Sequence, residues 1–284
     1  TSHWYQNNIE IPFFNYYLKG KGDDPKLSEA TIFFTGENKW RKLDQWPPVA
    51  TQPRPIYLAP DGALSWNLPT YVKAGSFSEY ISDPANPVPY TEDVHFRRTR
   101  EYMTDDQRFA SRRPDVLTFE TYALEEDLTL AGPVIANLKV SISGTDADFV
   151  VKVIDVFPDN FKYPDDIPQA GKSAGGSYLM GGYQMLVRGE IMRGKFRNSF
   201  TTPEPFKLNK IETVEFTLPD VAHTFKKGHR LMIQIQSSWF PLADRNPQQF
   251  MNIYEAKPED FKKVTIKIYH DGNNPSSISL PIMR

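Results

Sequence analysis

The sequence predicts a mainly β protein, a jelly-roll β-sandwich with one aromatic helix in front of it. Residues 134–142 alternate between apolar and polar side chains, which is the pattern of a half-buried strand. Residues 149–157 are apolar on nearly both sides, with only Lys152 and Asp155 as interruptions, as in a strand that is covered on both faces. Short strand-like segments separated by turn signals continue to the end of the chain, which is typical of a sandwich or jelly roll.

These two segments are expected to form the central hairpin of the sandwich. Residues 143–148, SGTDAD, carry the residue types of a turn between them. The other strands are then expected to pack around this hairpin. Counting the hairpin itself, strands are expected at residues 116–121, 126–130, 134–142, 149–157, 184–197, 211–218, 229–238, 263–270 and 276–282.

The beginning of the chain predicts one helix at residues 3–19. Trp4, Ile9, Phe14 and Tyr17 roughly follow helical spacing, although Pro12 favours a kink or a later start. The glycines that follow from residue 20 end it. A helix so rich in aromatic residues requires a large apolar partner.

Residues 23–113 are expected to connect the helix to the sandwich, with short strands at 30–34 and 55–58 and a turn-rich stretch at 60–89. Residues 91–113 are strongly charged and hold six arginines. An anion or carboxylate site is one interpretation. A solvated linker with local ion pairs to Glu101, Asp105 and Asp106 is the favoured one, because charge runs are usually solvated.

Composition excludes several classes of function. The chain has 284 residues and a net charge of −2, which argues against a general binder of polyanions such as nucleic acid. Its apolar runs fall short of the ~18 residues of a membrane span, and no secretory signal is visible. The absence of cysteine excludes disulfides and thiol chemistry. A first residue Thr1 instead of Met favours a processed or cleaved start.

One segment of the sequence matches the pattern of a catalytic motif. Residues 171–175, GKSAG, fit the Gly-x-Ser-x-Gly elbow of α/β-hydrolases, which would make Ser173 a nucleophile. The elbow requires a sharp turn from strand to helix, and here the motif lies in a Gly/Pro-rich loop between strands. A phosphate-binding loop is disfavoured too, because Asp166 stands where that motif needs glycine.

The remaining polar candidates have ordinary structural interpretations. The five histidines form no close pair at metal-ligand spacing, and His223 and His229 are expected at the surface or on edge strands. Asp146 and Asp148 are interpreted as turn residues in preference to cation ligands. Residues 244–246, DRN, are expected to form a structural ion pair or a loop clamp. No self-contained catalytic set, metal site or cofactor site is predicted.

Several blocks of sequence resemble one serine-hydrolase superfamily. They are residues 8–20 (NIEIPFFNYYLKG), 83–90 (DPANPVPY), 106–109 with 113–117 (DQRF and RPDVL), 143–158 (SGTDADFVVKVIDVFP), 181–183 (GGY) and 237–247 (SSWFPLADRNP). They are similar to the carboxy-terminal part of α-amino-acid ester hydrolases. Glutaryl-7-aminocephalosporanic-acid acylase, cocaine esterase and X-Pro dipeptidyl-peptidase belong to the same superfamily.

The resemblance implies a parent enzyme with an α/β-hydrolase domain, a helical cap and a carboxy-terminal jelly roll of the galactose-binding-like kind. Residues 1–22 then correspond to the last helix of the hydrolase domain, 23–113 to a connector and 114–284 to the jelly roll. The Ser-His-Asp triad of the family has no match in this sequence, and His3 lacks the context of the family's catalytic histidine. The hydrolase and cap domains of the same protein become the expected partners, with a small ester or amide as substrate and a homo-oligomer possible.

The resemblance also suggests where this part meets the substrate. The candidates for a wall of the substrate pocket lie in the loop 90–102 and are Val94, His95 and Phe96, because binding sites favour domain interfaces. The alternative is a loop that only bridges strands.

The second functional hypothesis is a stand-alone β-sandwich module that binds, for example, carbohydrate. The aromatic helix argues against this hypothesis. Acyl specificity, oligomeric state and compartment stay open, although export to the periplasm is plausible for the family.

Overall fold

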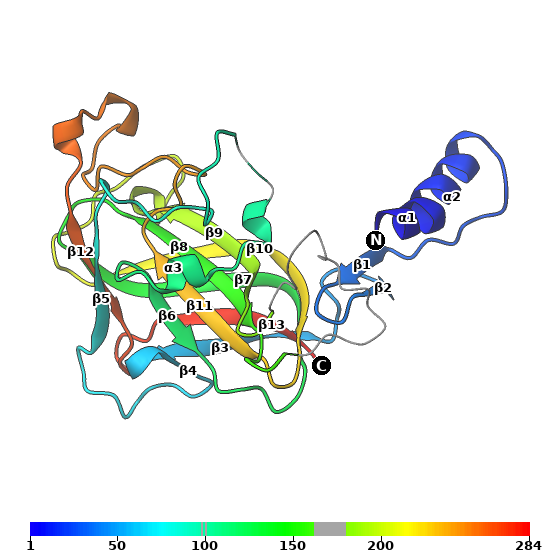
Figure 1. Cartoon of the computed structure of the whole chain (residues 1–284), viewed down its shortest axis with the longest axis horizontal. Helices are drawn as coiled ribbons and strands as arrows, with labels where there is room; N and C mark the ends of the chain where they lie inside the picture. The colour runs from blue at the N-terminus through cyan, green and yellow to red at the C-terminus, as the bar shows by residue number, and fades with distance from the viewer. Residues whose placement is uncertain (98, 100, 162–179) are drawn as a thin grey trace, which may run out of the picture.

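The chain folds into a β-sandwich from which a small arm projects (Figure 1), as a computed structural model shows. The structure describes residues 1–97, 99, 101–161 and 180–284. The predicted mainly β class is confirmed. No helix within these ranges combines the length and apolar character that crossing a membrane would require.

The strands of the described residues run from near the beginning of the chain to its end. They are β1 (Ala30–Phe34), β2 (Lys39–Leu43), β3 (Thr51–Ala59), β4 (Ala63–Ser65), β5 (Phe77–Ser82), β6 (Leu117–Glu120), β7 (Leu128–Ile142), β8 (Asp148–Val156), β9 (Gln184–Arg193), β10 (Glu212–Phe225), β11 (Arg230–Gln236), β12 (Val264–Tyr269) and β13 (Ser277–Met283). The expected segments 126–130 and 134–142 are one long strand, β7. Strands β2, β4 and β5 were not predicted, because their turn-rich or basic sequences hide short strands.

The two central strands belong to different layers of the sandwich. Strand β7 pairs antiparallel with β10, β12 and β13, whereas β8 pairs antiparallel with β9 and β11. The predicted hairpin between them is therefore wrong, and the turn at 143–147 carries the chain across the sandwich. An apolar face can be buried against a facing layer as well as beside a paired strand, so alternation alone does not give the pairing.

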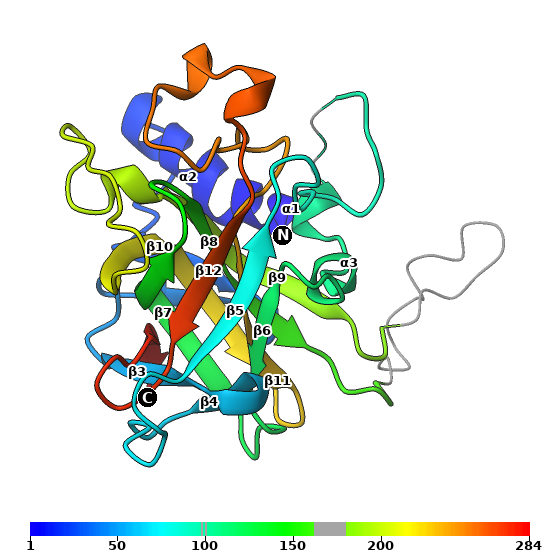
Figure 2. The same cartoon turned by 90° about the vertical axis from the view of Figure 1, so that its left-hand side faces the viewer.

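The core lies between these layers. Leu138 and Val140 of β7 face Val151 and Val153 of β8, and all four are fully buried in one apolar cluster. Figure 2 shows β5 and β12 side by side, in the middle of the face turned toward the viewer. Strands β3 and β5, from the expected connector, hydrogen-bond to β13 and β12 of the sandwich. The domain divisions at residues 22 and 113 stay predictions.

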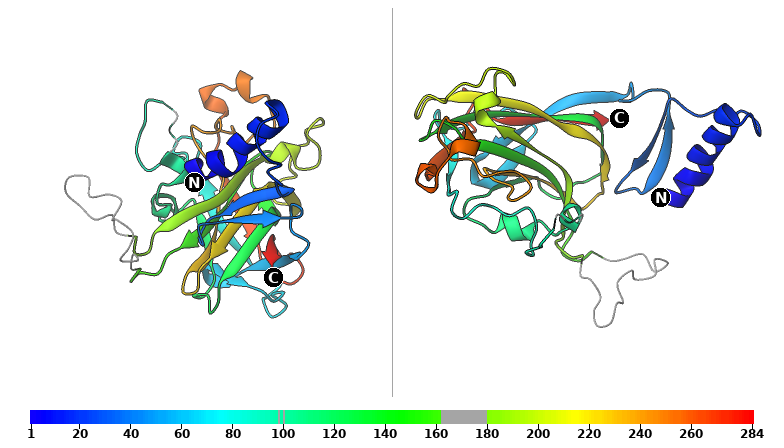
Figure 3. Two further views of the ribbon diagram at one scale, coloured as in Figure 1. Left: turned by 90° about the vertical axis from the view of Figure 1, so that its right-hand side faces the viewer. Right: turned by 90° about the horizontal axis from the view of Figure 1, so that it is seen from above.

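The arm consists of the first helix and the β1–β2 hairpin. The helical segments α1 (Ser2–Tyr5) and α2 (Ile11–Phe13) are joined and followed by π-helical turns at Gln6–Glu10 and Phe14–Leu18, close to the predicted range. None of these residues is buried. The Trp4 ring stacks on Trp40 of β2 with centroids 4.6 Å apart. Figure 3 shows the helix standing away from the sandwich beside the hairpin.

A short parallel bridge seats the arm on the sandwich. The Thr35 N–H donates to the carbonyl of Ala222 at 3.1 Å, and the Thr224 N–H donates to the carbonyl of Thr35 at 2.9 Å. Gly36 follows with φ +83°, and a Cβ atom there would lie 2.0 Å from the carbonyl oxygen of Thr224. Only glycine combines this backbone conformation with so close an approach.

A short helix, α3 (Arg108–Ser111), follows the charged loop. The guanidinium of Arg108 pairs with Asp106, and Arg113 pairs with Asp115 at 2.8 Å. The expected local ion pairing of this basic segment is confirmed for Asp106.

Candidate functional site

The loop that holds the predicted pocket-wall residues is open to solvent on its outer side. Val94 and Phe96 are 98% and 108% exposed, and His95 is exposed as well. His95 and Phe96 border a shallow cavity of about 240 Å³ together with Tyr90 and Leu242. The loop thus presents apolar and imidazole groups at the surface, where nothing within the described chain covers Val94 or Phe96.

The base of this loop is fixed to the sandwich. The Tyr90 N–H donates to the carbonyl of Phe240 at 2.9 Å, and the Phe240 N–H donates to the carbonyl of Val88 at 3.0 Å. The Val88 N–H also donates to Ser238 Oγ at 2.8 Å. Two of the family-like blocks, 83–90 and 237–247, are therefore bound to each other and hold the start of the exposed loop in place.

An aromatic cluster lies beneath the loop. The ring of Tyr102 lies between those of Tyr90 and Trp239, with centroid distances of 5.5 and 6.2 Å. Tyr90, Trp239 and Val150 of β8 are buried. The Tyr90 hydroxyl accepts a hydrogen bond from the Thr99 N–H at 3.2 Å. Rigid rings thus support both ends of the exposed segment.

Lys152 is buried under the same cluster. Its ammonium donates to Gln107 Oε1 at 3.0 Å and lies 5.3 Å from the centre of the Trp239 ring. The side chain is completely buried, and burial lowers the pKa of Lys152 to about 7. An amine with this pKa exchanges protons near neutrality, but its burial keeps it away from any solvent-borne substrate.

A second buried polar group is built on Asp155 of β8. His223 Nε2 lies 3.1 Å from Asp155 Oδ2, and His229 Nδ1 lies 2.8 Å from Asp155 Oδ1. Both imidazoles are buried, so the interpretation as surface histidines is wrong. The alternative, an edge strand, holds for His223, because β10 pairs only with β7 among the strands that the structure describes. Burial raises the pKa of Asp155, but the hydrogen bonds from the two histidines outweigh it and hold the pKa below its usual value.

This group also reaches the arm, because Thr35 Oγ1 lies 2.7 Å from His223 Nδ1. The sequence did contain a signal for it. Lys152 and Asp155 are the two charges inside an otherwise apolar strand, and a charge in such a strand needs a buried partner. What the sequence lacked was the identity of the partners, which come from β10 and from the turn before β11.

The acidic turn after β7 is a structural clamp. Asp146 and Asp148 both accept hydrogen bonds from Asn246 Nδ2, at 3.1 and 2.8 Å. Arg193 pairs with Asp148 at 3.1 Å. Burial, together with the charge of Asp148, raises the pKa of Asp146 to about 6. The interpretation as a turn residue is confirmed for Asp146, whereas Asp148 is the first residue of β8. The loop clamp at 244–246 is confirmed, with Asn246 as the clamping residue.

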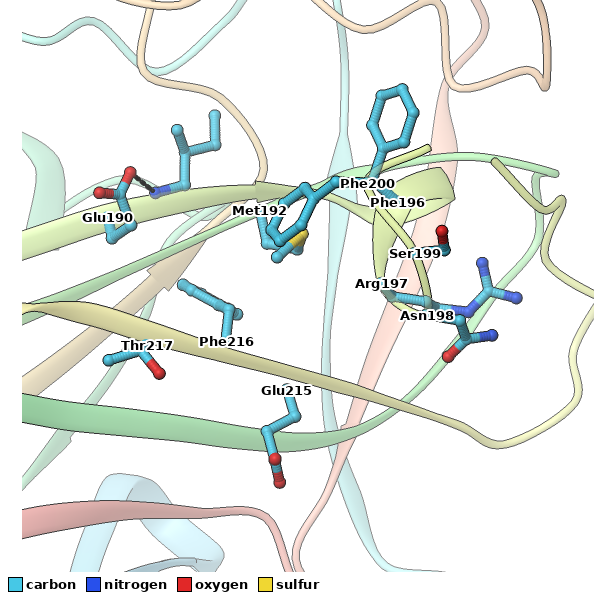
Figure 4. A pocket seen from close by; sticks show the side chains of 11 residues that line it. Glu190, Met192, Phe196, Arg197, Asn198, Ser199, Phe200, Glu215, Phe216 and Thr217 are labelled. Atoms are coloured by element: carbon cyan, nitrogen blue, oxygen red, sulfur yellow. Dashed lines mark hydrogen bonds between the residues drawn. The ribbon is translucent and has the colours of Figure 1, made fainter. Parts of the chain in front are cut away.

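Another cavity lies between the edges of β9 and β10 and has a volume of about 580 Å³ (Figure 4). Met192 and Phe216 form its apolar floor. The polar groups around it are already bonded: Glu190 accepts from the Ile191 N–H at 2.8 Å, and Arg197 pairs with Glu212. The cavity offers space but no nucleophile with a neighbouring base.

No group of three or more metal-binding side chains occurs in the ranges that the structure describes. Ser173 and the motif at 171–175 lie outside these ranges. The predicted residues Val94, His95 and Phe96 lie together on one loop, and no carboxylate among the described residues forms an ion pair with His95. The role of this loop as a wall of a substrate pocket stays a prediction.

Comparison with known proteins gives the family. Residues 19–279 match the model of the X-Pro dipeptidyl-peptidase C-terminal non-catalytic domain, and the chain belongs to this family. It is a mainly β, non-catalytic part of the kind found in ester hydrolases and X-Pro peptidases.

The relatives are longer than this chain. Cocaine esterase of Rhodococcus sp. (strain MB1 Bresler) is 29% identical over 96% of this chain and 45% of its own length. The crystal structure of an aminopeptidase from a marine sediment archaeon, Thaumarchaeota archaeon, has a TM-score of 0.89 and 37% identity, covering 100% of this chain and 45% of that one.

A structure of an α-amino acid ester hydrolase gives a TM-score of 0.89 and 41% identity, covering 99% of this chain and 45% of that chain. The chain thus spans somewhat less than half the length of these relatives. The resemblance drawn from the sequence blocks is confirmed.

Proposed function

We propose that this chain is the carboxy-terminal part of a serine hydrolase that cleaves esters or amides of small acyl groups. In this proposal the Ser-His-Asp triad lies in the part of the protein that the relatives have and this sequence does not span, and it acts through an acyl-enzyme. The chain itself supplies scaffold and pocket wall. The observation that carries the proposal is the identity of 37–41% with an aminopeptidase and an ester hydrolase over essentially the whole chain.

The helix of the arm supports this proposal. Phe13, Phe14 and Tyr17 are 41%, 44% and 55% exposed, although together they form an aromatic face. Isolated helices of this length are marginal in water, and exposed apolar faces mark interaction sites. The proposed partner of this face is the hydrolase domain of the same protein.

The central test compares two forms of the protein. The longer protein, which contains the hydrolase and cap domains, is expected to hydrolyse p-nitrophenyl esters and α-amino-acid esters, whereas residues 1–284 alone are expected to be inactive. Both forms are assayed at equal molar concentration. A longer protein without turnover, or full activity in residues 1–284, would contradict the proposal.

The exposed loop is assigned the wall of the acyl pocket. Val94, His95 and Phe96 form a ridge whose side chains are exposed here, and covering them against a substrate would recover apolar contact. In the longer protein, Phe96→Ala is expected to lower kcat/KM several-fold, with the loss increasing as the acyl group grows from acetyl to phenylacetyl. Tyr254→Ala is the matched control, because Tyr254 is 84% exposed elsewhere on the surface. Equal effects of the two substitutions would show that the loop only connects strands.

A further inference from the structure

A second pocket opens where the arm meets the edges of β9 and β10, with a volume of about 410 Å³. Phe33 of the arm, Trp46 just after β2 and Leu186 of β9 form its apolar wall. Arg188 of β9 and Asp220 of β10 bring one positive and one negative charge to the same pocket. This volume is in the range of small-molecule sites, and so is the combination of apolar walls with few polar groups.

The two charges do not neutralise each other. Among the residues that the structure describes, neither Arg188 nor Asp220 forms an ion pair, so their charged atoms lie more than 4.0 Å apart. Arg188 Nε is buried with no hydrogen-bond acceptor. Asp220 holds the Trp46 indole N–H through Oδ2, at 2.5 Å. A ligand can reach Arg188 only through the part of its side chain that is still exposed, and the side chain as a whole is half-buried and lines the pocket. An unpaired guanidinium favours a carboxylate partner.

Arg188 and Asp220 both lie at β-bulges. Strand β9 has a bulge at Val187, where the register with β8 shifts between Val153 and Ile154. Strand β10 has a bulge at Pro219 and Asp220, where the register with β7 shifts between Leu218 and Val221. Bulges re-aim side chains and are frequent beside functional sites. They also protect free strand edges, but edge protection alone does not explain why an arginine and an aspartate without ion-pair partners among the described residues line the same pocket.

We propose that this pocket binds a zwitterionic α-amino acid with an apolar side chain. The carboxylate of the ligand pairs with the Arg188 guanidinium, and its ammonium group pairs with Asp220. The apolar side chain lies against Phe33, Trp46 and Leu186. Binding is a property of this chain and does not depend on the proposed hydrolase activity, although an amino acid is also the product of amino-acid ester hydrolysis.

The probe is L-leucine, titrated into residues 1–284 by calorimetry, together with two analogues that each lack one charge. N-acetyl-L-leucine lacks the ammonium group, and L-leucinamide lacks the carboxylate. L-leucine is expected to saturate one site, and each analogue to bind about tenfold or more weakly, because each loses a charged hydrogen bond.

The variants assign the two contacts. Arg188→Gln is expected to weaken L-leucine and N-acetyl-L-leucine about tenfold and to leave L-leucinamide unchanged. Asp220→Asn is expected to weaken L-leucine and L-leucinamide and to spare N-acetyl-L-leucine. Arg112→Gln is the control, because Arg112 is exposed and does not line the pocket. Thermal unfolding of each variant checks that it is folded.

The three compounds titrated into the unchanged protein test the proposal even if a variant fails to fold. No saturable binding of L-leucine, or equal affinity for all three compounds, overturns the proposal. Unchanged L-leucine binding by folded Arg188→Gln overturns it as well.

Discussion

Replacing Asp155 by alanine is expected to be among the most destabilising single changes in this chain. Asp155 accepts hydrogen bonds from His223 and His229 at 3.1 and 2.8 Å and is 1% exposed. Asp155→Ala leaves both imidazole N–H groups buried without an acceptor. Hydrogen bonds to a charged group contribute about 1.5–3 kcal/mol each, so a loss of about 3–5 kcal/mol in the free energy of unfolding is expected.

Asp155→Asn provides the matched control. Its amide oxygen can accept from one histidine, and its NH₂ group can donate to the other once that imidazole changes tautomer. Asparagine is therefore expected to lose about half as much stability as alanine. Urea-induced unfolding followed by circular dichroism at pH 7 measures both values. A loss below about 1 kcal/mol for Asp155→Ala would refute the view that Asp155 holds the two histidines.

The pH dependence gives an independent check. The pKa of Asp155 is lower in the folded than in the unfolded chain, because the histidine hydrogen bonds outweigh the effect of burial. Its contribution is thus fully present above the unfolded value of about 3.9 and is lost as the pH falls through the folded pKa. The stability difference between the unchanged protein and Asp155→Ala should narrow in this acidic range. A constant difference from pH 7 to pH 3 would contradict the assignment.

Three further changes test other parts of the structure. Gly36→Ala is expected to destabilise the chain by clearly more than Gly75→Ala, because both have positive φ but only the Cβ at Gly36 meets a backbone atom, at 2.0 Å; each bears about 1–2 kcal/mol for the left-handed backbone, and urea unfolding should show the excess. Lys152→Met is expected to flatten the rise of stability between about pH 7 and pH 10, since the folded chain releases the Lys152 proton near pH 7 and the unfolded chain only near pH 10.4, which unfolding curves at both pH values would detect. Trp40→Ala removes the stacking partner of Trp4, a contact of about 0.5–1.5 kcal/mol, and should speed proteolysis of the first helix while the melting temperature of the sandwich stays the same.

The local sequence pattern determined the class of fold and most of the strands. Alternation with period two identified β7 and β12, and the apolar run identified β8, because each side chain reports the environment of its own face. The helix at the start was predicted from the spacing of its aromatic residues. The family was identified from several blocks of sequence that resemble it. These features depend on neighbouring residues and so can be read along the chain.

Only the tertiary structure decided which strands pair and which polar groups meet. Strands β7 and β8 face each other across the core, since burial of an apolar face does not depend on whether its cover is a paired strand or an opposite layer. Asp155 and His223 lie 68 positions apart, and Arg188 and Asp220 share a pocket through two bulges. Such contacts depend on register and layer packing, which the order of residue types along one strand does not contain.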